Sequence, residues 1–292
     1  MKVLVTGSTG QLGGELVRVL AGEGHEIIAP DRREFDLAFP EKVGDAIRAR
    51  EADWVINCAA YTQVDQAEAE PELAYRVNRD SAAGIARAVS AYGGRMLQVS
   101  TDFIFSGKQS CPYTEEDHPD PVNVYGQSKW EGERVVREIL PGALILRTAW
   151  VYGSRGANFV RTILMAAASR EELRVVDDQI GTPSWTADIS RTIQALIRGD
   201  RQGVYHFTNE GVASWYDFAC AITALGASVG FPVVARRVLP IPSADYPTQA
   251  IRPRFSVLDK QKIRTLLPAP IPHWRESLHA MLKELYQCEE SS

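Results

Sequence analysis

Residues 2–13 read Lys2-Val3-Leu4-Val5-Thr6-Gly7-Ser8-Thr9-Gly10-Gln11-Leu12-Gly13, a short apolar run followed by three spaced glycines. The apolar run predicts a buried first strand, and residues 15–20 predict the first helix. In such a strand–turn–helix unit, the first glycine allows a tight turn, the second lets the backbone approach a pyrophosphate and the third permits close packing of helix on strand. Free amides at the helix N-terminus then face the phosphate charge. The stretch predicts a dinucleotide-binding turn, although glycines also build ordinary turns.

A second predicted strand, residues 25–30, ends in Asp31-Arg32-Arg33. An acid about 20 residues beyond a glycine turn accepts hydrogen bonds from the adenosine ribose, whereas a neighbouring arginine can hold a 2′-phosphate. Because both groups are present, the sequence indicates a dinucleotide and leaves NADH and NADPH open. A solvated loop of mixed charge is the plainer interpretation.

Tyr125 and Lys129 lie four residues apart in Tyr125-Gly126-Gln127-Ser128-Lys129. On a helix, positions i and i+4 share one face, so the phenol and the ammonium can reach the same ligand. A phenol has a pKa of about 10, and a neighbouring cation favours its ionised form. The pair predicts proton donation to a carbonyl oxygen during hydride transfer, with a surface pair on a helix as the plainer interpretation.

The composition indicates a soluble enzyme. The chain has 292 residues, of which 45% are hydrophobic and 24% charged, enough for one large domain or a large and a small one. The formal net charge of −5 argues against nucleic-acid and membrane-surface partners, which call for concentrated positive charge. We find no spanning apolar run and no signal peptide, so we expect a cytoplasmic location. Reduced thiols and no metal site are expected from four dispersed cysteines, Cys58, Cys111, Cys220 and Cys288.

Strand-like and helix-like segments alternate along the first half of the chain. Strands are predicted at residues 54–58, 95–100 and 143–147, and a helical segment at 71–91. This alternation favours an α/β fold, a Rossmann-type doubly wound parallel sheet whose ligands gather at the carboxyl ends of the strands. We expect residues 1–157 to be mainly the NAD(P)-binding Rossmann domain. Residues 158–292 are expected to form mainly a smaller C-terminal substrate-binding lobe, with some segments returning to the first domain.

Longer motifs carry a resemblance to a known family. Together with the glycine turn and the Tyr125/Lys129 pair, the chain contains Asn57-Cys58-Ala59-Ala60-Tyr61-Thr62 and Val99-Ser100-Thr101-Asp102-Phe103-Ile104-Phe105. With these motifs it resembles the extended short-chain dehydrogenase/reductases. Four further blocks resemble the dTDP-4-dehydrorhamnose reductase family: Arg147-Thr148-Ala149-Trp150-Val151-Tyr152-Gly153, Asn158-Phe159-Val160, Asp178-Gln179-Ile180-Gly181-Thr182-Pro183, and Arg252-Pro253 with Ser256. The resemblance runs from Met1 to about Leu282.

The resemblance implies an NADPH- or NADH-dependent reduction. The C4 keto group of dTDP-4-dehydro-6-deoxy-L-mannose would be reduced to give dTDP-L-rhamnose for cell-surface polysaccharide synthesis. Tyr125 would donate a proton to the carbonyl oxygen and Thr101 would hydrogen-bond the same oxygen. Lys129 would lower the pKa of the phenol and bind the nicotinamide ribose. The implied cofactor contacts are Gly7, Thr9, Gly10, Gln11, Leu12, Gly13, Asp31, Arg32, Asp36, Leu37, Cys58, Ala59, Ala60, Tyr61, Asn78, Tyr125 and Lys129.

The dTDP-sugar is the implied partner. Its contacts would be Val64, Asp65, Thr101, Phe103, Trp150, Asn158, Gln179 and Arg252. The aromatic face of Trp150 suits the apolar side of a deoxyhexose, and a guanidinium such as that of Arg252 suits a diphosphate. The plainer interpretations are core packing for Trp150, a loop cap for Thr101 and a surface charge for Arg252. Asp102 is ambiguous and is left out of catalysis.

The sequence departs from the family pattern at two places. Phe103 stands where the family often carries Tyr, which removes a hydroxyl from the expected sugar pocket. Some family members dimerise through magnesium. Glu15 stands at one such position, but residues 186–188 lack the paired acids, so a homodimer is allowed and a metal bridge is not expected.

Three other functions are compatible with parts of the same pattern. A dehydratase needs Asp-Glu directly after the threonine, and this chain has Asp102-Phe103. An epimerase needs only the Tyr/Lys pair and stays open. A regulatory subunit resembling that of methionine adenosyltransferase keeps the fold without needing a proton donor, so Thr101, Tyr125 and Lys129 favour an enzyme.

Overall fold

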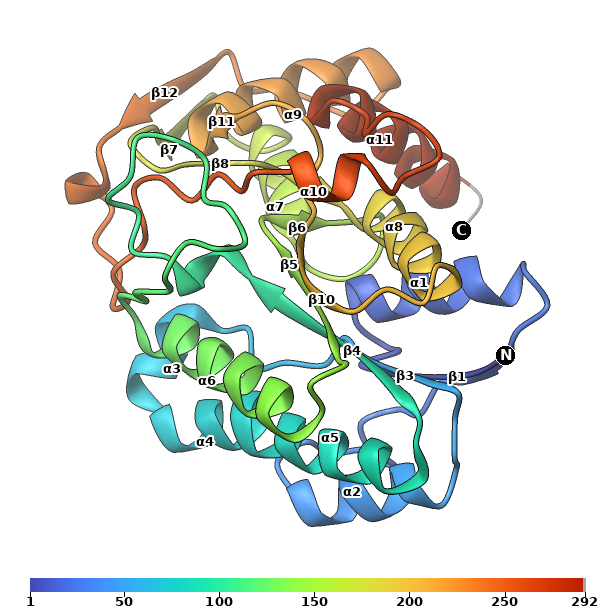
Figure 1. Cartoon of the computed structure of the whole chain (residues 1–292). Helices are drawn as coiled ribbons and strands as arrows, with labels where there is room; N and C mark the ends of the chain where they lie inside the picture. The colour runs from blue at the N-terminus through green and yellow to red at the C-terminus, as the bar shows by residue number, and fades with distance from the viewer. Residues whose placement is uncertain (291–292) are drawn as a thin grey trace.

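A six-stranded parallel sheet forms the centre of the computed structural model, which describes residues 1–290 (Figure 1). The strands lie in the order β10-β5-β4-β3-β1-β2. Their bounds are β1 (Lys2–Thr6), β2 (Glu26–Ile28), β3 (Trp54–Asn57), β4 (Arg95–Thr101), β5 (Leu144–Thr148) and β10 (Gly203–His206). All five pairings are parallel. The arrangement confirms the predicted Rossmann-type sheet.

Helices cover both faces of this sheet. One face packs against α1 (Gln11–Ala21) and α8 (Thr186–Arg198), and the other against α2 (Pro40–Arg48), α5 (Ser81–Tyr92) and α6 (Val124–Ile139). The apolar positions of α1, Leu12, Leu16 and Leu20, recur every four residues and therefore form one buried stripe. This is the doubly wound arrangement that the alternating sequence pattern predicts.

The helical segment predicted at residues 71–91 is divided in the structure. It contains α4 (Pro71–Tyr75), a π-helical turn at Arg76–Asp80 and then α5. Asn78, in the π-turn, is buried and its amide accepts a hydrogen bond from Tyr61 N at 2.9 Å and donates one to Ser128 Oγ at 2.9 Å. Such turns often occur at functional sites, and this one ties the loop after β3 to α6. The short helix α3 (Val64–Ala69) precedes it.

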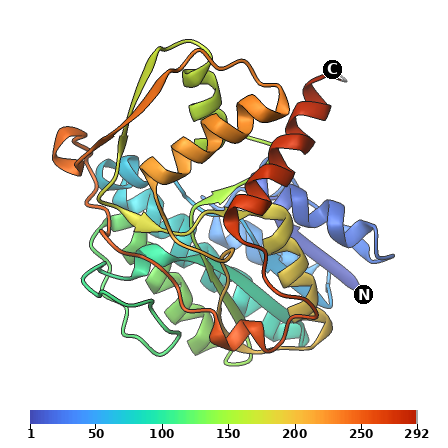
Figure 2. The same cartoon turned by 90° about the horizontal axis from the view of Figure 1, so that it is seen from above.

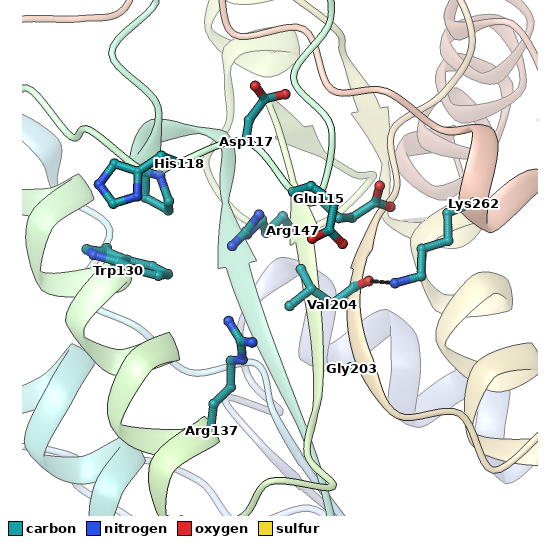
Figure 3. A pocket seen from close by; sticks show the side chains of 11 residues that line it. Glu115, Asp117, His118, Trp130, Arg137, Arg147, Gly203, Val204 and Lys262 are labelled. Atoms are coloured by element: carbon teal, nitrogen blue, oxygen red, sulfur yellow. Dashed lines mark hydrogen bonds between the residues drawn. The ribbon is translucent and has the colours of Figure 1, made fainter.

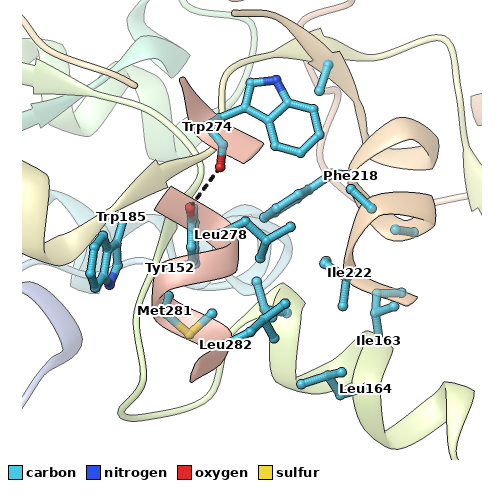
Figure 4. Packing of buried hydrophobic residues seen from close by; sticks show 14 of the residues in the cluster. Tyr152, Ile163, Leu164, Trp185, Phe218, Ile222, Trp274, Leu278, Met281 and Leu282 are labelled. Carbon is cyan, nitrogen blue, oxygen red and sulfur yellow. Dashed lines mark hydrogen bonds between the residues drawn. The ribbon is translucent and has the colours of Figure 1, made fainter. Parts of the chain in front are cut away.

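A second apolar cluster (Figure 4) is formed by helices that lie above the sheet (Figure 2). It is built by α7 (Phe159–Ala167), α9 (Trp215–Val229) and α11 (Trp274–Glu290), which contribute residues such as Leu164, Phe218 and Leu282. The remaining elements are β6 (Val151–Tyr152) paired with β9 (Ser184–Trp185), β7 (Glu172–Val176) with β12 (Arg237–Ile241), β8 (Ile180–Gly181) with β11 (Ala213–Ser214), the 3-10 turns Asp102–Ile104 and Ser243–Asp245, and α10 (Gln261–Arg264). Burial of each large apolar side chain contributes about 1.5–3 kcal/mol, so this cluster is a core in its own right.

The chain crosses between these two parts more than once. After β5 it enters the upper cluster, then α8 packs on α1 and β10 pairs with β5 at the edge of the sheet. The carboxyl ends of β1, β3, β4 and β5 therefore face the segments that follow residue 150. Within residues 1–290, no helix is both long and apolar enough to cross a membrane.

Candidate active site

The glycine turn has the backbone geometry that its sequence predicts. Gly7 has a φ of +67°, and a Cβ built there would lie 2.8 Å from Ala59 N. A Cβ on Gly13 would lie 2.2 Å from Gly7 O. Positive φ and close backbone approach both require glycine at these positions. The turn therefore packs directly against the loop that follows β3.

The N-terminus of α1 is open toward this turn. Gly10 is its N-cap, and among residues 1–290 no side chain caps the helix there. The first turn also contains no acidic side chain. An uncapped helix N-terminus that carries partial positive charge binds anions such as phosphate. The turn thus fits the pyrophosphate of a dinucleotide, with the amides near Gln11, Leu12 and Gly13 as the groups that would hold it.

The segment after β2 forms a turn around Asp31. Asp31 Oδ1 accepts hydrogen bonds from Arg33 N at 2.8 Å and Glu34 N at 3.1 Å. Arg32 extends into solvent with 81% of its side chain exposed, and its Nε lies 3.8 Å from Asp36 Oδ1. Ser8 Oγ donates to Pro30 O at 2.7 Å, so the glycine turn and this segment are joined. The guanidinium of Arg32 is accessible to a ligand.

Buried polar side chains connect neighbouring strands beneath the turn. Thr6 Oγ1 donates to Asn57 Oδ1 at 2.5 Å, and Asn57 Nδ2 donates to Gln98 Oε1 at 2.8 Å. Gln98 Nε2 then donates to Val99 O at 2.9 Å, the same carbonyl that accepts Lys129 Nζ at 2.7 Å. This chain of bonds fixes Lys129 relative to β4. The sequence does not reveal the role of Gln98, because a polar residue inside an apolar strand gives no signal of its partner.

Tyr125 and Lys129 lie on the first turns of α6, as predicted. The helix begins where Asn123 Oδ1 accepts Gly126 N at 2.7 Å, a standard N-cap. Gly126 lets the helix approach Phe103, since a Cβ there would lie 2.2 Å from Phe103 O. The Phe103 and Tyr125 rings meet edge to face at 5.7 Å. The close approach places the phenol beside the end of β4.

The pKa values of the pair differ from the expectation. Burial lowers the pKa of Lys129 to about 8, while the charge of Glu133 on the next helical turn raises it. Burial raises the pKa of Tyr125 to about 12, and the contribution that lowers it comes from a hydrogen bond with Thr101 rather than from Lys129. The phenol is therefore protonated at neutral pH. In this protonated form Tyr125 can act as a proton donor.

Thr101 lies at the carboxyl end of β4 and is buried. Its Oγ1 accepts Phe103 N at 3.2 Å, the loop-capping contact of the plainer interpretation, and also donates to Asp102 Oδ1 at 3.1 Å. Because the same hydroxyl is a partner of Tyr125, capping and catalysis do not exclude each other. Thr101 and Tyr125 thus form one polar centre, held at the end of β4.

Trp150 follows β5 and has a φ of 45°, in a region that bulky residues rarely adopt. Its ring stacks on Trp215 of α9 with centroids 3.5 Å apart and planes at 6°. Gly181 lies against the ring, since a Cβ there would lie 2.6 Å from Trp150 Cε2. Thr148 of β5 is paired with Thr101 of β4, so Trp150 leaves the sheet close to the polar centre. Trp215 was not found from the sequence.

The remaining predicted substrate contacts are held by polar partners. Arg252 forms a two-pronged ion pair with Asp65, at 2.7 and 3.0 Å, which connects two predicted residues. Gln179 Nε2 donates to Ser243 Oγ at 2.9 Å. Asn158 caps α7 and donates to Gln11 Oε1 at 3.0 Å, which links the glycine turn to the upper cluster. Val64 begins α3, next to Asp65.

Other predicted cofactor residues are placed as follows. Cys58, Ala59, Ala60 and Tyr61 follow β3, and burial raises the pKa of the Cys58 thiol to about 12. Leu37 is buried, and its carbonyl accepts Ser81 Oγ at 2.5 Å. Thr9 is exposed in the glycine turn. The thiol of Cys58 is therefore unreactive at neutral pH.

A cavity of about 400 Å³ lies elsewhere, at the edge strand β10 (Figure 3). Two of the basic residues that line it have partners: Arg147 pairs with Glu133 at 2.8 Å, and Lys262 Nζ donates to Val204 O at 2.7 Å. His206 N of the edge strand donates to Glu115 Oε1 at 3.0 Å. The contacts of Lys262 and Glu115 give hydrogen-bond partners to backbone groups of the edge strand β10. The cavity contains none of the predicted site residues.

The acids considered for a metal bridge are engaged in other contacts. Glu15 is buried and pairs with Arg18 at 2.5 Å. Asp188 Oδ2 accepts hydrogen bonds from Asn209 Nδ2 at 2.8 Å and Ser277 Oγ at 2.6 Å. Across the described residues, 1–290, no group of three or more His, Cys, Asp or Glu side chains is arranged to hold a metal.

Comparisons with known proteins agree with this geometry. The family model described as RmlD substrate binding domain matches residues 1–287. The chain is 40% identical to dTDP-4-dehydrorhamnose reductase of Burkholderia thailandensis, over 98% of this chain and 99% of that protein. It is 38% identical to dTDP-4-keto-6-deoxy-D-glucose reductase of Streptomyces niveus, over 94% of each. The crystal structure of dTDP-4-dehydrorhamnose reductase from Bacillus anthracis in complex with NADP has a TM-score of 0.91 and 36% identity, covering 97% of this chain and 100% of that one.

Proposed function

The chain belongs to the RmlD substrate binding domain family, which includes the dTDP-4-dehydrorhamnose reductases, and we propose that it reduces the C4 keto group of dTDP-4-dehydro-6-deoxy-L-mannose to give dTDP-L-rhamnose. It is an NAD(P)H-dependent oxidoreductase. A relative from Bacillus subtilis, 39% identical, is named spore coat polysaccharide biosynthesis protein, which supports a role in making cell-surface polysaccharide. The proposed partner is therefore a dTDP-sugar.

One observation carries this proposal: the Tyr125 phenol and the Thr101 hydroxyl lie together at the end of β4, beside a glycine turn that fits a dinucleotide. In the proposed reaction Tyr125 gives its proton to the C4 oxygen, and Thr101 stabilises negative charge that develops on that oxygen. Lys129, four residues further along α6, would bind the nicotinamide ribose of the cofactor. NADPH or NADH, when bound, supplies the hydride.

We infer a division of labour between the two parts of the chain. Residues 1–157 would bind the cofactor, and residues 158–292 would supply most of the sugar pocket, with α8 and β10 as the segments that return to the Rossmann domain. Trp150 would present its ring to the deoxyhexose, and Gln179 would lie at the border of the pocket. The Asp65–Arg252 pair would hold the segment around residue 252 against α3 near the substrate nucleotide.

A second candidate function differs only in the sugar. The relative from Streptomyces niveus is named for dTDP-4-keto-6-deoxy-D-glucose, which has not passed through an epimerase, and its identity to this chain is nearly the same. Phe103 supplies no hydroxyl beside Tyr125, so it does not select between the two sugars by hydrogen bonding. The two functions share the same chemistry at C4.

The test uses the purified full chain and dTDP-4-keto-6-deoxyglucose, with and without a 3,5-epimerase, while the absorbance of NADPH or NADH is followed. Oxidation that requires the epimerase supports the rhamnose-forming reductase. Oxidation without it supports the second candidate, and no oxidation in either case contradicts both.

A variant tests the assigned proton donor. We expect Tyr125→Phe to lower turnover by about 10²–10⁴-fold, the usual contribution of a general acid, with NADPH affinity nearly unchanged because the phenol is not needed to hold the phosphates. Tyr75→Phe, on α4 and outside the site, is the matched control. A loss of turnover below about threefold would show that another group donates the proton.

A further inference from the structure

Asp102 is a buried carboxyl that the proposed mechanism leaves without a role. Its side chain is 1% exposed, and Thr101 Oγ1 donates a hydrogen bond to its Oδ1 at 3.1 Å. The other carboxyl oxygen, Oδ2, is buried and has no hydrogen-bond partner among residues 1–290. A buried polar atom without a partner costs stability, so its retention calls for an explanation. Asp102 lies next to the polar centre and is hydrogen-bonded to the Thr101 hydroxyl, which takes part in the proposed reaction.

The direction of the Thr101 hydroxyl depends on the state of this carboxyl. A hydroxyl has one proton to donate, and a carboxylate can only accept. When Asp102 is ionised, the Thr101 proton is committed to it, and Thr101 can only accept a hydrogen bond from any further group. When Asp102 is protonated, it can donate to Thr101 Oγ1. The Thr101 proton is then free to turn toward Tyr125 and the oxygen that reacts there.

We propose that Asp102 is a positioning residue that sets the donor direction of the Thr101 hydroxyl, with the protonated acid favouring reduction. Reduction places negative charge on the C4 oxygen, which a donor stabilises and an acceptor does not. The ionised acid favours the opposite direction, in which Thr101 accepts from the product hydroxyl. No bond between heavy atoms changes at Asp102, and no proton leaves it during turnover. The inference rests on the proposed reduction at C4.

The surroundings of Asp102 make both forms accessible. Burial raises its pKa to about 6, and the neighbouring Ser256 side chain, the hydrogen bond from Thr101 and its own and the next backbone amide lower it. The groups that face the carboxyl are Thr101 on β4, Tyr125 on α6 and Ser256 in the segment after β12. The charge of Asp102 also raises the pKa of Tyr125, so an ionised Asp102 keeps the phenol protonated but takes the Thr101 proton away. Both effects follow the ionisation of Asp102, so they change together as the pH passes its pKa.

The experiment is a pH profile of turnover in the direction of reduction, between about pH 5 and about pH 8, at saturating NADPH. We expect turnover of the native chain to fall as pH rises through the pKa of Asp102, by about tenfold, the order of one net hydrogen bond. Asp102→Asn presents an amide that can donate to Thr101 at every pH, so its turnover should not fall over this pH range. A fall in turnover of Asp102→Asn like that of the native chain would overturn the proposal.

Glu115→Gln is the matched control. Burial also raises the pKa of Glu115, but that carboxyl accepts His206 N at the edge of the sheet and lies outside the site. We expect this variant to keep the native pH profile. If turnover of Glu115→Gln no longer fell with rising pH, the fall would arise from Glu115 rather than from Asp102, and the proposal would be contradicted.

A spectroscopic measurement tests Asp102 without turnover. Infrared difference spectra of the native chain, recorded during a pH titration, are expected to show the carbonyl band of a protonated carboxylic acid that disappears as the pH rises. The band should be missing in Asp102→Asn and present in Glu115→Gln. A native chain with this band and no turnover of either sugar would contradict the proposed substrate but not the state of Asp102. Absence of the band at about pH 5 would contradict the role of Asp102 itself.

Discussion

Gly7 and Gly13 on the proposed cofactor side of the site, and Trp150 and Trp215 on the proposed sugar side, are held by different kinds of contact. The glycines act through backbone positions, since a Cβ at either one would collide with main-chain atoms nearby. The tryptophans act through their stacked side chains, and Trp150 and Trp215 are 65 residues apart in the sequence. One side is therefore built from a single local stretch, and the other from long-range packing between the sheet and the upper cluster.

This difference has a consequence for what a substitution can do. A main-chain collision cannot be relieved by choosing another rotamer, so a change on the cofactor side moves the helix or the turn. A lost ring on the sugar side leaves the sheet in place and changes the shape of one wall. We therefore expect the first kind of change to affect folding and cofactor binding together, and the second to affect only the substrate.

The largest effect is expected for Gly13→Ala. A Cβ 2.2 Å from Gly7 O forces α1 away from the turn and moves the amides that would face the pyrophosphate. We expect a loss of at least about 2 kcal/mol in the free energy of unfolding, as for other overpacked sites, and a matching loss of NADPH affinity. Denaturant melts and fluorescence titration with NADPH measure the two. Gly22→Ala, whose Cβ would meet Val19 O at an ordinary 3.5 Å, is the control. Normal NADPH binding by Gly13→Ala would contradict the assigned cradle.

The same difference explains what the sequence could predict. The first strand, the glycine turn, α1 and the Tyr125/Lys129 pair are local patterns, and the structure contains each of them where the residues indicate. The parallel sheet with helices on both faces follows from the alternation of strands and helices, but the π-turn around Asn78 does not, because a helical pattern gives no sign of one extra residue per turn. The cytoplasmic location stays a prediction.

The residues that the sequence did not reveal depend on partners far along the chain. Trp215 becomes part of the site only because it stacks on Trp150, and Gln98 only because it shares Val99 O with Lys129. Asp102 is adjacent to a predicted residue, yet its burial and its unpartnered oxygen are visible only in three dimensions. Expected pKa values fail for the same reason, since the desolvation that raises the pKa of Tyr125 comes from the packed surroundings.

A smaller effect, again on the cofactor side, is expected for Arg32→Ala. The exposed guanidinium lies beside the turn of Asp31, whose Oδ1 is engaged by two backbone amides. A charge-assisted hydrogen bond contributes about 1.5–3 kcal/mol, so affinity for NADPH should fall by about tenfold or more, with NADH affinity unchanged. Competitive titrations with both cofactors measure the ratio. Arg48→Ala, an exposed arginine of α2, serves as the control. Equal losses for the two cofactors would show that Arg32 does not contact the 2′-phosphate.

The smallest effect is expected on the sugar side, for Trp215→Ala. An aromatic pair contributes about 0.5–1.5 kcal/mol beyond its buried area, so KM for the sugar should rise by roughly threefold to tenfold while the NADPH dissociation constant stays the same. Trp215→Phe keeps an aromatic face against Trp150 and should restore most of the loss. The stacked indoles should also give a paired circular-dichroism signal that Trp215→Phe removes, whereas Trp130→Ala, a partly buried tryptophan of α6, leaves it intact. If Trp215→Ala weakened NADPH binding as much as sugar binding, the two sides would share one packing unit. The contrast between local and long-range construction would then not hold for this site.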